Sequence, residues 1–397
     1  MFRKLSHQSD DYYKGKRVFV RVDLNVPIVA GEIMEDYRVQ MIIPTIKYLT
    51  NRGATVILAS HLGRPKGKII THMSLKPVSE RLSQLLGDQV KFVEDCVGNQ
   101  VNQAVRSLRG GEVILLENLR FHKGEEYNDG DFSRMLSSSA DVYVNDAFSA
   151  SHRKHASVYG MVSWFTKGFA GFVMEKEVQY LTRIRDNPNR PFIVMIGGSK
   201  ISDKLKALRD LIVNADKVLL GGGVAYTFLK AKGVRIGDSL LDYDSLKWAS
   251  AVLSEHQDKI HLPEDHVVAK DIQNKASIKT VSGNISPGLR GFDIGPTTAA
   301  KYGQIISESR GTVFWNGPLG VFESDEFSSG TVSLAHALVR AKSCGATVVI
   351  GGGDTIAALR KANVKDDDVT HISTGGGASM EFLGGEELPG IHVLENV

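Results

Sequence analysis

The sequence predicts an α/β fold made of two doubly wound parallel-sheet domains that a hinge helix joins. The length supports two domains, because 397 residues hold two or three domains of about 100–200 residues each. Short apolar runs alternate with helical patterns from end to end, which is typical of βαβ units around a parallel sheet. The apolar runs are rich in Val, Ile and Leu and alternate little with polar residues, as expected for parallel strands buried on both faces.

The apolar runs form one set in each half of the chain. The first set predicts strands at residues 17–22, 55–59, 112–116 and 141–144. The second set predicts strands at residues 192–196, 217–220, 312–314, 347–350 and 369–372. Because parallel strands need long crossover connections, we expect helices between them.

Apolar stripes with helical spacing lie between these strands. One stripe comprises Leu75, Val78, Leu82, Leu85 and Leu86, and another comprises Ile201, Leu205, Leu208 and Ile212. Both follow the i, i+3, i+4, i+7 pattern of an amphipathic helix. A third helix is predicted to open at Arg38 and to bury Val39, Ile42, Ile43, Ile46 and Leu49, with a kink or a late start at Pro44.

A seam between the two domains is predicted at residues 165–191. Residues 174–185 have the pattern of a charged amphipathic helix, and residues 186–191 form a polar connector that contains two prolines. We therefore place an N-terminal domain at residues 1–170, an interdomain helix and hinge at 171–190, and a C-terminal domain from residue 191.

Composition and charge favour a cytoplasmic enzyme or binding protein. The formal net charge is 48 − 45 = +3, too small by itself to indicate nucleic acid or a membrane surface as a partner. Cys96 and Cys344 have no spacing typical of a disulfide framework or a metal site, so both are expected to be reduced and buried. No signal peptide precedes Arg3 and Lys4, and no apolar run approaches the roughly 18 residues of a membrane span.

In the first half, the loops that follow the strands are cationic and rich in histidine. They are residues 21–27, 60–65, 117–122 and 145–148, and the last continues into His152, Arg153, Lys154 and His155. The planar guanidinium of arginine suits phosphate and carboxylate groups, so these loops indicate a small polyanionic substrate. The alternative is scattered surface charge, which four successive strand ends disfavour. A metal site at His152 and His155 is also disfavoured, because their neighbours are basic.

In the second half, the corresponding loops are rich in glycine. They are residues 197–204, 221–223, 315–323, 351–355 and 375–377. Glycine lets backbone N–H groups approach phosphates, and a helix N-terminus adds a favourable dipole. Lys200 and Lys204 are placed to neutralise phosphate charge, and Asp354 offers the hard oxygen that Mg²⁺ prefers. Tight turns alone are the alternative, which the number of such loops makes a poor explanation.

Three familiar signatures are missing from the sequence. It has no G-x-x-x-x-G-K-[ST] segment of a P-loop enzyme and no G-x-G-x-x-G segment in a βαβ unit. The motif set of the protein kinases is also missing. These gaps weigh against a dinucleotide-dependent oxidoreductase, the competing enzyme class on a doubly wound fold.

The chain resembles bacterial phosphoglycerate kinases in motifs that span residues 21–385. In order, these are RVDLNVP, SHLGRPKG, ENLRF, NDAF, HRKHAS, GGSKISDK, GGGVAYTFL, DIGP, WNGPLGVFE, GGGDT and STGGGASMEFLGG. The resemblance implies two Rossmann-like domains and reversible phosphoryl transfer between 1,3-bisphosphoglycerate with ADP and 3-phosphoglycerate with ATP. It also implies a 3-phosphoglycerate-binding domain at 1–170, a nucleotide-binding domain at 191–374, and a segment 375–397 that packs back on the N-terminal domain.

The resemblance also assigns residues to the acidic substrate. Asp23 and Asn25 would contact its hydroxyl and carboxyl end. Arg38 would reach the carboxyl group that undergoes transfer. The phosphate and the rest of the substrate would be held by His61, Leu62, Gly63, Arg64, Arg120 and Arg153.

On the nucleotide side, the resemblance assigns phosphate contacts to Gly198 and Lys204 and the adenine site to Gly223 and Gly291. Glu323 would hold the ribose, and Asn316 would lie near the phosphate chain. Gly352, Gly353 and Thr355 would lie beside Asp354, the residue that would carry Mg²⁺. The moving phosphoryl group would be stabilised by Lys200 and the amides of Gly375 and Gly376.

The implied chemistry agrees with the residue types. A carboxylate acceptor is already ionised near pH 7, since carboxyl pKa values are about 4, so no general base is needed and none is evident. The implied protein is a monomer that closes about its hinge and binds no nucleic acid or membrane. A nucleotide-binding regulatory protein that has lost activity is the non-enzymatic alternative. The intact set Arg38, Lys200, Lys204 and Asp354 argues against it.

Overall fold

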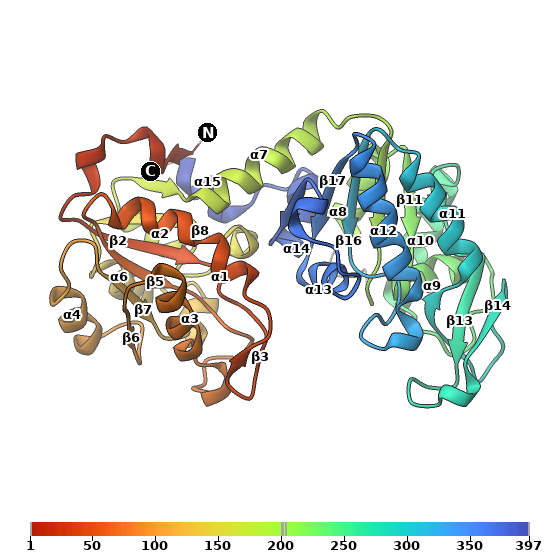
Figure 1. Ribbon diagram of the computed structural model, residues 1–397, viewed down its shortest axis with the longest axis horizontal. Helices are drawn as coiled ribbons and strands as arrows, with labels where there is room; N and C mark the ends of the chain where they lie inside the picture. The colour runs from red at the N-terminus through yellow and green to blue at the C-terminus, as the bar shows by residue number, and fades with distance from the viewer. Residues whose placement is uncertain (1, 200–201, 203–204, 396–397) are drawn as a thin grey trace. The chain divides into compact units, whose positions relative to one another are not determined.

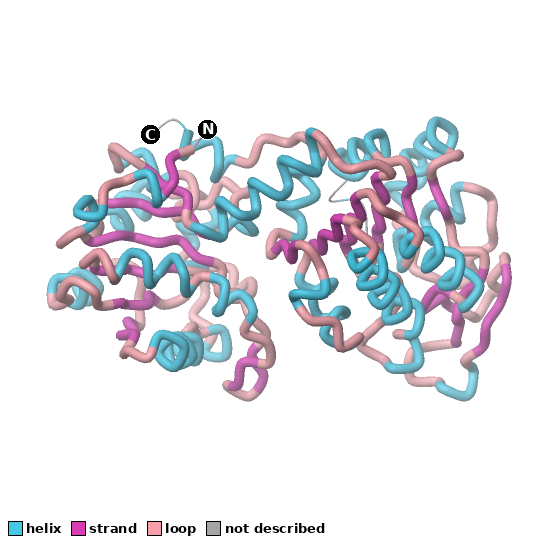
Figure 2. Tube along the Cα trace, turned by 45° about the horizontal axis from the view of Figure 1, so that its top comes forward, coloured by secondary structure: helices cyan, strands magenta, loops and turns pink. Residues whose placement is uncertain are grey.

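The computed structural model describes residues 2–199, 202 and 205–395. The chain forms two compact units: the first comprises Met1–Gln179 with Glu387–Val397, and the second comprises Tyr180–Glu386. In both units the strands of the main sheet lie in the interior and helices lie around them (Figures 1 and 2). The two units are described separately below.

A seven-stranded parallel sheet forms the centre of the first unit. In spatial order its strands are β1 (Arg3–Lys4), β9 (Gly168–Ala170), β8 (Val142–Asp146), β2 (Arg17–Val22), β5 (Thr55–Ala59), β7 (Val113–Leu116) and β6 (Val90–Val93). Every residue of β5 and β7 is buried, as expected for central parallel strands covered on both faces. A separate short hairpin pairs β3 (Ile28–Val29) with β4 (Glu32–Ile33).

The strands predicted in the first half are confirmed, with small shifts at their ends. β2 and β5 have the predicted bounds, whereas β7 begins one residue later and β8 extends to Asp146. The sequence prediction missed the two edge strands, β1 and β6, and β9, which lies next to β1. β1 and β9 are only two and three residues long, and β6 has two buried residues out of four, so none of them has a long apolar run.

The helices of the first unit surround this sheet (Figure 1). They are α1 (Tyr37–Met41), α2 (Ile43–Thr50), α3 (Lys76–Leu86), α4 (Asn99–Arg106), α5 (Lys123–Glu126), α6 (Gly130–Ser137) and α15 (Pro389–Glu395). The helix predicted to open at Arg38 is divided at Ile42, the residue between α1 and α2. Pro44 lies in the first turn of α2, where its missing N–H costs nothing.

A six-stranded parallel sheet forms the centre of the second unit. In spatial order its strands are β12 (Ile260–His261), β11 (Lys217–Leu220), β10 (Phe192–Ile196), β16 (Thr312–Asn316), β17 (Thr347–Gly351) and β18 (His371–Ser373). All five strands predicted for this half are confirmed. β10 and β11 have the predicted bounds, while β16 and β17 are longer and β18 begins later.

A three-stranded antiparallel sheet in the second unit was not predicted. Its strands, in spatial order, are β14 (Lys279–Ser282), β13 (Asp265–Ala269) and β15 (Arg290–Ile294). β14 has no buried residue and β15 is only half buried. β14 and β15 therefore lack the continuous apolar runs by which the other strands were recognised, whereas β13 is mostly buried but has an apolar run of only three residues.

The remaining helices belong to the second unit or to the boundary between the units. Those of the second unit are α8 (Leu205–Asn214), α9 (Gly222–Ala231), α10 (Leu246–His256), α11 (Pro296–Ser307), α12 (Ser329–Ser343), α13 (Gly353–Lys361) and α14 (Gly376–Leu383). The helix predicted at 174–185 is α7 (Phe172–Asp186), and the division between the units falls within it. The C-terminal segment is divided: α14 belongs to the second unit and α15 to the first.

The two cysteines differ in their surroundings. Both thiols are free, and Cys96 is buried as expected. Cys344 is exposed, so the expectation of two buried thiols was wrong for this residue. Cys344 is the C-cap residue of α12, so it lies at the exposed end of that helix. Within the described residues, no helix is both long and apolar enough to cross a membrane.

Candidate active site

The order of strands creates a crevice at the carboxyl end of the first sheet. β2 has β5 on one side and β8 on the other, so the loops that leave β2 and β8 diverge, and ligands bind at such points in open α/β sheets. Asp23 follows β2 directly, and Ser149 lies three residues beyond the end of β8. The Ser149 hydroxyl donates a hydrogen bond to the Asp23 carboxylate, which joins the two loops.

The predicted residues Asp23, Asn25 and Arg38 lie together in this crevice. Arg38 Nη1 lies 3.3 Å from Asp23 Oδ2 and donates to the backbone oxygen of Asn25 at 2.7 Å. Asn25 Oδ1 accepts from the backbone N–H of Gly63 at 2.9 Å. The first loop is therefore held in place by a charge pair and by hydrogen bonds to its neighbour.

Arg120 is a buried guanidinium with unused donor capacity. Its Nη1 donates to the backbone oxygen of Gly63 at 2.8 Å. Its Nε is 3.7 Å from Glu126 Oε1 and has no hydrogen bond among the described residues. Burial, and then the charge of Arg21, lower its pKa to about 10. A buried cation with a free donor is costly in isolation, so this site favours an anion.

His61 and Arg21 form a second buried pair beside Arg120. Arg21 Nη2 lies 3.1 Å from His61 Nδ1, and Arg21 also donates to Ser157 Oγ at 2.8 Å. Burial lowers the pKa of His61 well below its usual value, and the cations Arg120, Arg21 and Arg38 lower it further. His61 is therefore neutral and can donate only one hydrogen bond. Sequence reasoning missed Arg21 as a site residue, although a charge inside the apolar run of β2 was a usable signal.

Arg64 and Arg153 are exposed. Arg153 Nε donates to His152 Nε2 at 3.1 Å. Burial lowers the pKa of His155 to about 3, helped by the charges of Arg120, Arg21 and Arg153. His155 is thus a buried neutral side chain among cations, which agrees with a structural role. The first unit therefore brings together several buried or half-buried cationic side chains around one crevice and leaves Arg64 and Arg153 exposed to solvent.

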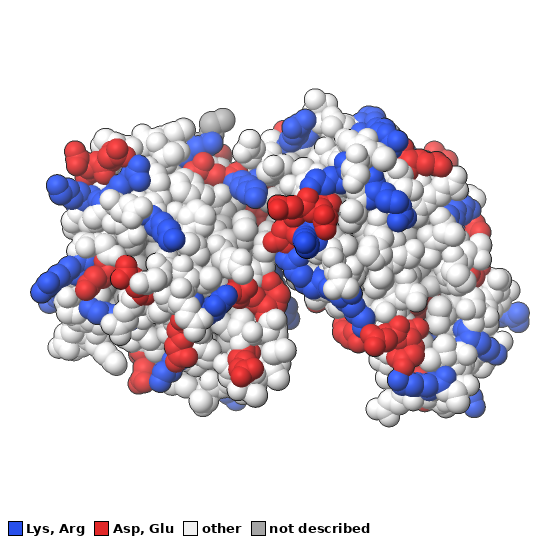
Figure 3. Space-filling model, in the orientation of Figure 1, with Lys and Arg blue, Asp and Glu red and all other residues white. Residues whose placement is uncertain are grey.

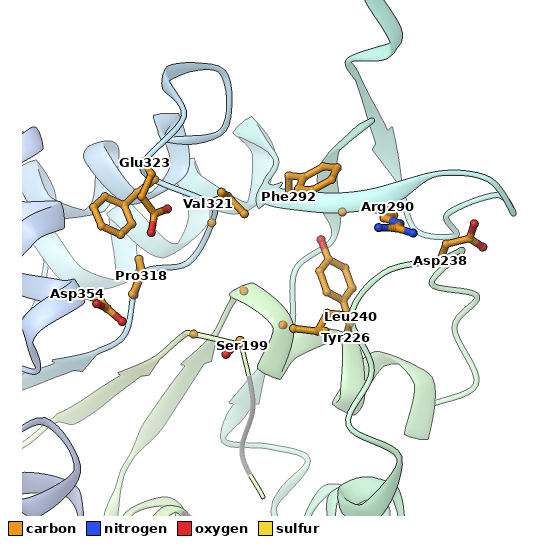
Figure 4. Close-up of a pocket in the computed structure, with 16 residues that line it drawn as sticks. Ser199, Tyr226, Asp238, Leu240, Arg290, Phe292, Pro318, Val321, Glu323 and Asp354 are labelled. Carbon is orange, nitrogen blue, oxygen red and sulfur yellow. The ribbon is translucent and has the colours of Figure 1, made fainter. Parts of the chain in front are cut away.

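The second unit has a crevice of the same topological kind. β10 has β11 on one side and β16 on the other, so the loops after β10 and β16 diverge at the carboxyl end of the sheet. A cavity of about 460 Å³ opens beside these loops. Figure 4 shows its lining residues, which are Gly198, Ser199, Gly222, Gly223, Tyr226, Asp238, Leu240, Arg290, Gly291, Phe292, Pro318, Gly320, Val321, Phe322, Glu323 and Asp354.

The predicted residues Gly198, Gly223, Gly291, Glu323 and Asp354 all line this cavity. A Cβ atom on Gly291 would lie 1.7 Å from the Tyr226 hydroxyl, and one on Gly223 would lie 2.5 Å from the backbone oxygen of Ser199. Neither position has room for a side chain, so the backbone itself forms the wall at both glycines. A partly apolar cavity of this size suits a small organic ligand.

Charged and polar groups lie at the edges of the same cavity. In Figure 4 the Tyr226 hydroxyl points toward the strand that carries Arg290 and Phe292. Glu323 comes from the loop after β16, and Asp354 comes from the first turn of α13. Both carboxylates are exposed and can accept hydrogen bonds from a sugar or bind a cation.

Helix N-termini converge near the end of β16. Asn316, the last residue of β16, donates through Nδ2 to the backbone oxygens of Gly351 at 3.0 Å and Gly376 at 3.3 Å. A Cβ atom on Gly352 would lie 3.5 Å from the Gly376 Cα. The first turns of α13 and α14 therefore lie side by side, and their free N–H groups form a suitable binding site for phosphates.

Some predicted nucleotide residues do not line the cavity. They are Asn316, Gly352, Gly353 and Thr355. Two of these side chains form hydrogen bonds with the backbone. Asn316 donates to the Gly351 oxygen, and Thr355 Oγ1 accepts from the Gly317 N–H at 2.8 Å. Gly375 and Gly376 begin α14. Lys200 and Lys204 lie outside the described residues. The nucleotide contacts of all these residues stay predictions.

Sequence reasoning missed Asp238, Leu240, Arg290 and Phe292 as lining residues. Arg290 and Phe292 belong to β15, a strand of the sheet that was not predicted. Tyr226 belongs to the GGGVAYTFL motif but was not predicted to line a site. An aromatic residue one turn after three glycines was a usable signal for a site that binds an aromatic ring.

The chain is similar to known phosphoglycerate kinases over nearly its whole length. Residues 9–386 match the family model described as phosphoglycerate kinase. A phosphoglycerate kinase from Chlorobium phaeobacteroides is 48% identical over 393 residues, which are 98% of each chain. One from Picosynechococcus is 47% identical over 384 residues, which are 96% of each chain.

Solved structures give the same result. The structure of phosphoglycerate kinase from Pyrococcus horikoshii has a TM-score of 0.88 at 35% identity and covers 100% of this chain and 98% of that chain. That of Coxiella burnetii has a TM-score of 0.81 at 36% identity, with coverage of 100% and 99%. The predicted fold class is therefore confirmed. The chain belongs to the phosphoglycerate kinase family, and it is a phosphotransferase with a carboxyl group as acceptor.

Proposed function

We propose that the chain transfers a phosphoryl group directly and reversibly between 1,3-bisphosphoglycerate with ADP and 3-phosphoglycerate with ATP, in glycolysis and gluconeogenesis. The main support is the contrast between the two crevices. One is lined by buried and exposed arginines, and the other by glycines beside helix N-termini. A small polyanion fits the first, and a nucleotide fits the second.

The acidic substrate occupies the crevice of the first unit, the 3-phosphoglycerate-binding domain of this proposal. Its phosphate is held by His61, Arg64, Arg120 and Arg153, with backbone contacts from Leu62 and Gly63. The free Nε of Arg120 supports this assignment. Asp23 and Asn25 hold the hydroxyl and carboxyl end, and Arg38 reaches the reacting carboxyl group.

ATP and ADP, the co-substrates of the family, occupy the crevice of the second unit, the nucleotide-binding domain. The adenine lies between the backbone walls at Gly223 and Gly291, and Glu323 accepts hydrogen bonds from the ribose. The phosphate chain extends toward Gly198, Asn316 and the first turns of α13 and α14, with Lys204 and Thr355 beside it. Gly352 and Gly353 give close backbone approach.

Asp354 fits the role of the magnesium ligand. Its carboxylate is exposed at the start of α13 and lines the cavity, and Mg²⁺ is usually held by one or two carboxylates together with substrate phosphates. Bound there, Mg²⁺ would neutralise charge on the nucleotide phosphates.

The protein contributes positioning and charge rather than covalent chemistry. The acceptor carboxylate is ionised near pH 7 and attacks the phosphoryl group in line, so no proton needs to be removed. Arg38, Lys200 and the N–H groups of Gly375 and Gly376 stabilise the charge on the moving group, as preorganised donors do in transition states. Because the two substrates bind to different units, a closure about the α7 hinge brings them together.

The other partners in this proposal are few. The enzyme acts as a cytoplasmic monomer and binds neither nucleic acid nor membrane. Figure 3 shows Lys and Arg side chains interspersed with Asp and Glu on the face it draws of each unit. Nucleic-acid-binding proteins instead cluster basic residues on one face.

The stereochemistry of transfer tests the direct mechanism. ATP made chiral at the γ-phosphorus is allowed to react with 3-phosphoglycerate, and the configuration of the product phosphoryl group is determined. A single in-line transfer inverts the configuration. Retention would mean two transfers through a phosphorylated enzyme and would contradict the proposal.

A further inference from the structure

A group of potential metal ligands lies in the first unit. Asp95 and Cys96 follow the end of β6, and His122 is the N-cap residue of α5. One carboxylate oxygen, the thiol sulfur and one ring nitrogen all lie within 4.8 Å of one another. Among the described residues, this is the one group of three or more His, Cys, Asp or Glu side chains with that geometry.

Packing and hydrogen bonds fix the His122 imidazole and the Asp95 carboxylate. His122 Nε2 lies 2.7 Å from Asp95 Oδ1, and the same oxygen accepts from the Cys96 backbone N–H at 2.7 Å. The imidazole stacks on Phe132 with ring centroids 5.1 Å apart. The ring is therefore held with Nε2 facing the carboxylate, so little side-chain entropy remains to be lost on binding.

Burial of the group is one-sided. The Cys96 thiol is buried at 2% exposure, whereas the side chains of His122 and Asp95 are 35% and 42% exposed. An ion can therefore enter from solvent past the imidazole and the carboxylate and meet the sulfur at the inner end.

The charges around the thiol are mainly negative. The carboxylates of Asp95, Glu125 and Glu117 are the charged groups that act on it. Glu117 is already occupied, since it accepts from Ser74 Oγ at 2.6 Å and from Leu75 N at 2.9 Å. Glu125 likewise accepts from Ser157 Oγ at 2.6 Å. These groups add a negative field that favours a cation without competing as ligands.

We propose that Cys96 Sγ, His122 Nε2 and the Asp95 carboxylate bind one Zn²⁺ ion, with water as the fourth ligand. Sulfur, imidazole and carboxylate are the donors that zinc takes in proteins, at about 2.0–2.3 Å. Tetrahedral geometry at those distances places ligands about 3.3–3.8 Å apart. The ion takes the place of the proton between His122 and Asp95, and that proton and the thiol proton are both released to solvent, with the remaining ring proton of His122 on Nδ1. The His122–Asp95 pair opens by about 0.6 Å, and the sulfur, which lies within 4.8 Å of both partners, moves to the tetrahedral spacing.

This site differs from the one proposed for Mg²⁺ and does not depend on the proposed reaction. Mg²⁺ takes oxygen ligands and binds poorly to thiolate and imidazole. Bound zinc would join the segment after β6 to the loop that carries Arg120, two residues before His122. The ordinary alternative is an ion pair beside an inert core thiol.

Cobalt, as a spectroscopic substitute for zinc, tests the proposal in the purified full-length chain freed of metals by a chelator. Titration with Co²⁺ is expected to give a thiolate-to-cobalt charge-transfer band that saturates at one ion per chain. Added Zn²⁺ should abolish the band, and millimolar Mg²⁺ should leave it unchanged. Competition with a chromophoric chelator then gives the zinc affinity.

The variants Cys96→Ser, His122→Gln and Asp95→Asn identify the ligands, and Cys344→Ser is the matched control because its thiol is exposed elsewhere. We expect Cys96→Ser to remove the band, His122→Gln and Asp95→Asn to weaken zinc binding at least tenfold, and Cys344→Ser to change neither. His122 and Asp95 are partly exposed, so their variants test the site even if Cys96→Ser fails to fold. No band in the unaltered chain, or a band lost only in Cys344→Ser, would overturn the proposal.

Discussion

Arg38 is a half-buried guanidinium with a carboxylate on one side. Its Nη1 is 3.3 Å from Asp23 Oδ2, which fixes the side chain before substrate arrives. We predict that Arg38→Ala lowers kcat by about 10²–10³, the usual effect of removing one preorganised donor from a transition state, and changes the KM for 3-phosphoglycerate much less.

Steady-state kinetics measure this effect, with Arg81→Ala as the control. Arg81 is also paired with an aspartate, at 2.7 Å from Asp36, but it belongs to α3 and has no role in the proposal. An unchanged kcat in Arg38→Ala would remove this residue from the transition state.

Glu323 is an exposed carboxylate at the rim of the nucleotide cavity. We predict that Glu323→Ala raises the KM for the nucleotide roughly tenfold, about 1.4 kcal/mol, and leaves kcat nearly unchanged. The reason is that a ribose contact is equally strong in the ground state and in the transition state.

Glu326→Ala is the matched control for Glu323→Ala. Glu326 lies three residues away and pairs with Lys275 and with Ser324, outside the cavity lining. A fall in kcat at constant nucleotide KM in Glu323→Ala would contradict the assignment of Glu323 to the ribose.

Single residues of the site were predictable where their type was unusual for their position. Arginines and histidines after strands, such as His61 and Arg120, could be recognised because a strand-end loop has no packing need for them, whereas Arg38 lies in α1 and was assigned from the family resemblance. The charge of Arg21 inside the apolar run of β2 marked it as unusual, but its contacts with His61 and Ser157 join residues 40 and 136 positions apart in the chain. Only the folded sheet brings these partners together.

At the scale of elements, the start of α7 depends on a buried carboxylate. Asp146 ends β8 at 1% exposure, accepts from Met174 N at 3.0 Å, and has an Oδ2 atom without a hydrogen bond among the described residues. Burial raises its pKa from 3.8 to about 6, although hydrogen bonds to Thr45 and Met174 lower it in part. Between about pH 4 and pH 6, Asp146 is therefore protonated in the folded state and ionised in the unfolded state.

This proton linkage predicts a pH-dependent stability. Since the folded chain binds more protons, the free energy of unfolding falls as pH rises from about 4 to about 6, by at most about 3 kcal/mol from this group. Asp146→Asn keeps an acceptor for Met174 without the charge. Urea unfolding should show the free-energy difference between variant and unaltered chain shifting in favour of the variant as pH rises from 4 to 7.

Asp141→Asn provides a control with the opposite sign. A hydrogen bond from Arg17 lowers the pKa of Asp141, so its contribution to stability is present above its ordinary pKa and is lost as pH falls. The difference between Asp141→Asn and the unaltered chain should therefore shift against the variant as pH rises through the range below about 4, and should stay nearly constant from pH 4 to pH 7. A pH-independent difference for Asp146→Asn would show that Asp146 is ionised like a surface carboxylate.

The elements themselves were predictable in proportion to their burial. Central strands such as β5 and β10 are buried along their whole length, and their bounds were predicted correctly. β14 is exposed and β15 is half buried, so no apolar run marks them. β13 is mostly buried, but its apolar run is only three residues long and was missed. The absence of this sheet from the prediction is the reason that one wall of the cavity was missed.

At the scale of the whole molecule, the account requires motion. With the two substrates assigned to separate units, transfer needs the reacting atoms to come within about 3–3.5 Å. We predict that small-angle X-ray scattering shows a smaller radius of gyration with 3-phosphoglycerate and MgADP together than with either alone. This pair of ligands cannot react, so the closed state accumulates. An unchanged radius would count against hinge closure.

The division into two units was predictable from length and from the polar connector, because a chain of this size exceeds what one core usually holds. The placement of the C-terminal end was expected only from the family resemblance, which put all of residues 375–397 on the N-terminal domain, whereas the boundary between the units follows Glu386. α14 packs on the second unit, where Gly384 meets Ala207, whereas α15 joins the first unit through the hydrogen bond from Asn145 Nδ2 to the Gly390 oxygen at 3.1 Å. Contacts between residues so far apart in the chain leave no local pattern.

The most direct test of the central claim is a coupled assay of the unaltered chain. It contains 3-phosphoglycerate and MgATP, and glyceraldehyde-3-phosphate dehydrogenase reports 1,3-bisphosphoglycerate by oxidation of NADH. The account predicts turnover that disappears when 3-phosphoglycerate is omitted or when EDTA removes Mg²⁺. A folded chain that binds MgADP yet shows no turnover would contradict it and would favour a nucleotide-binding protein without kinase activity.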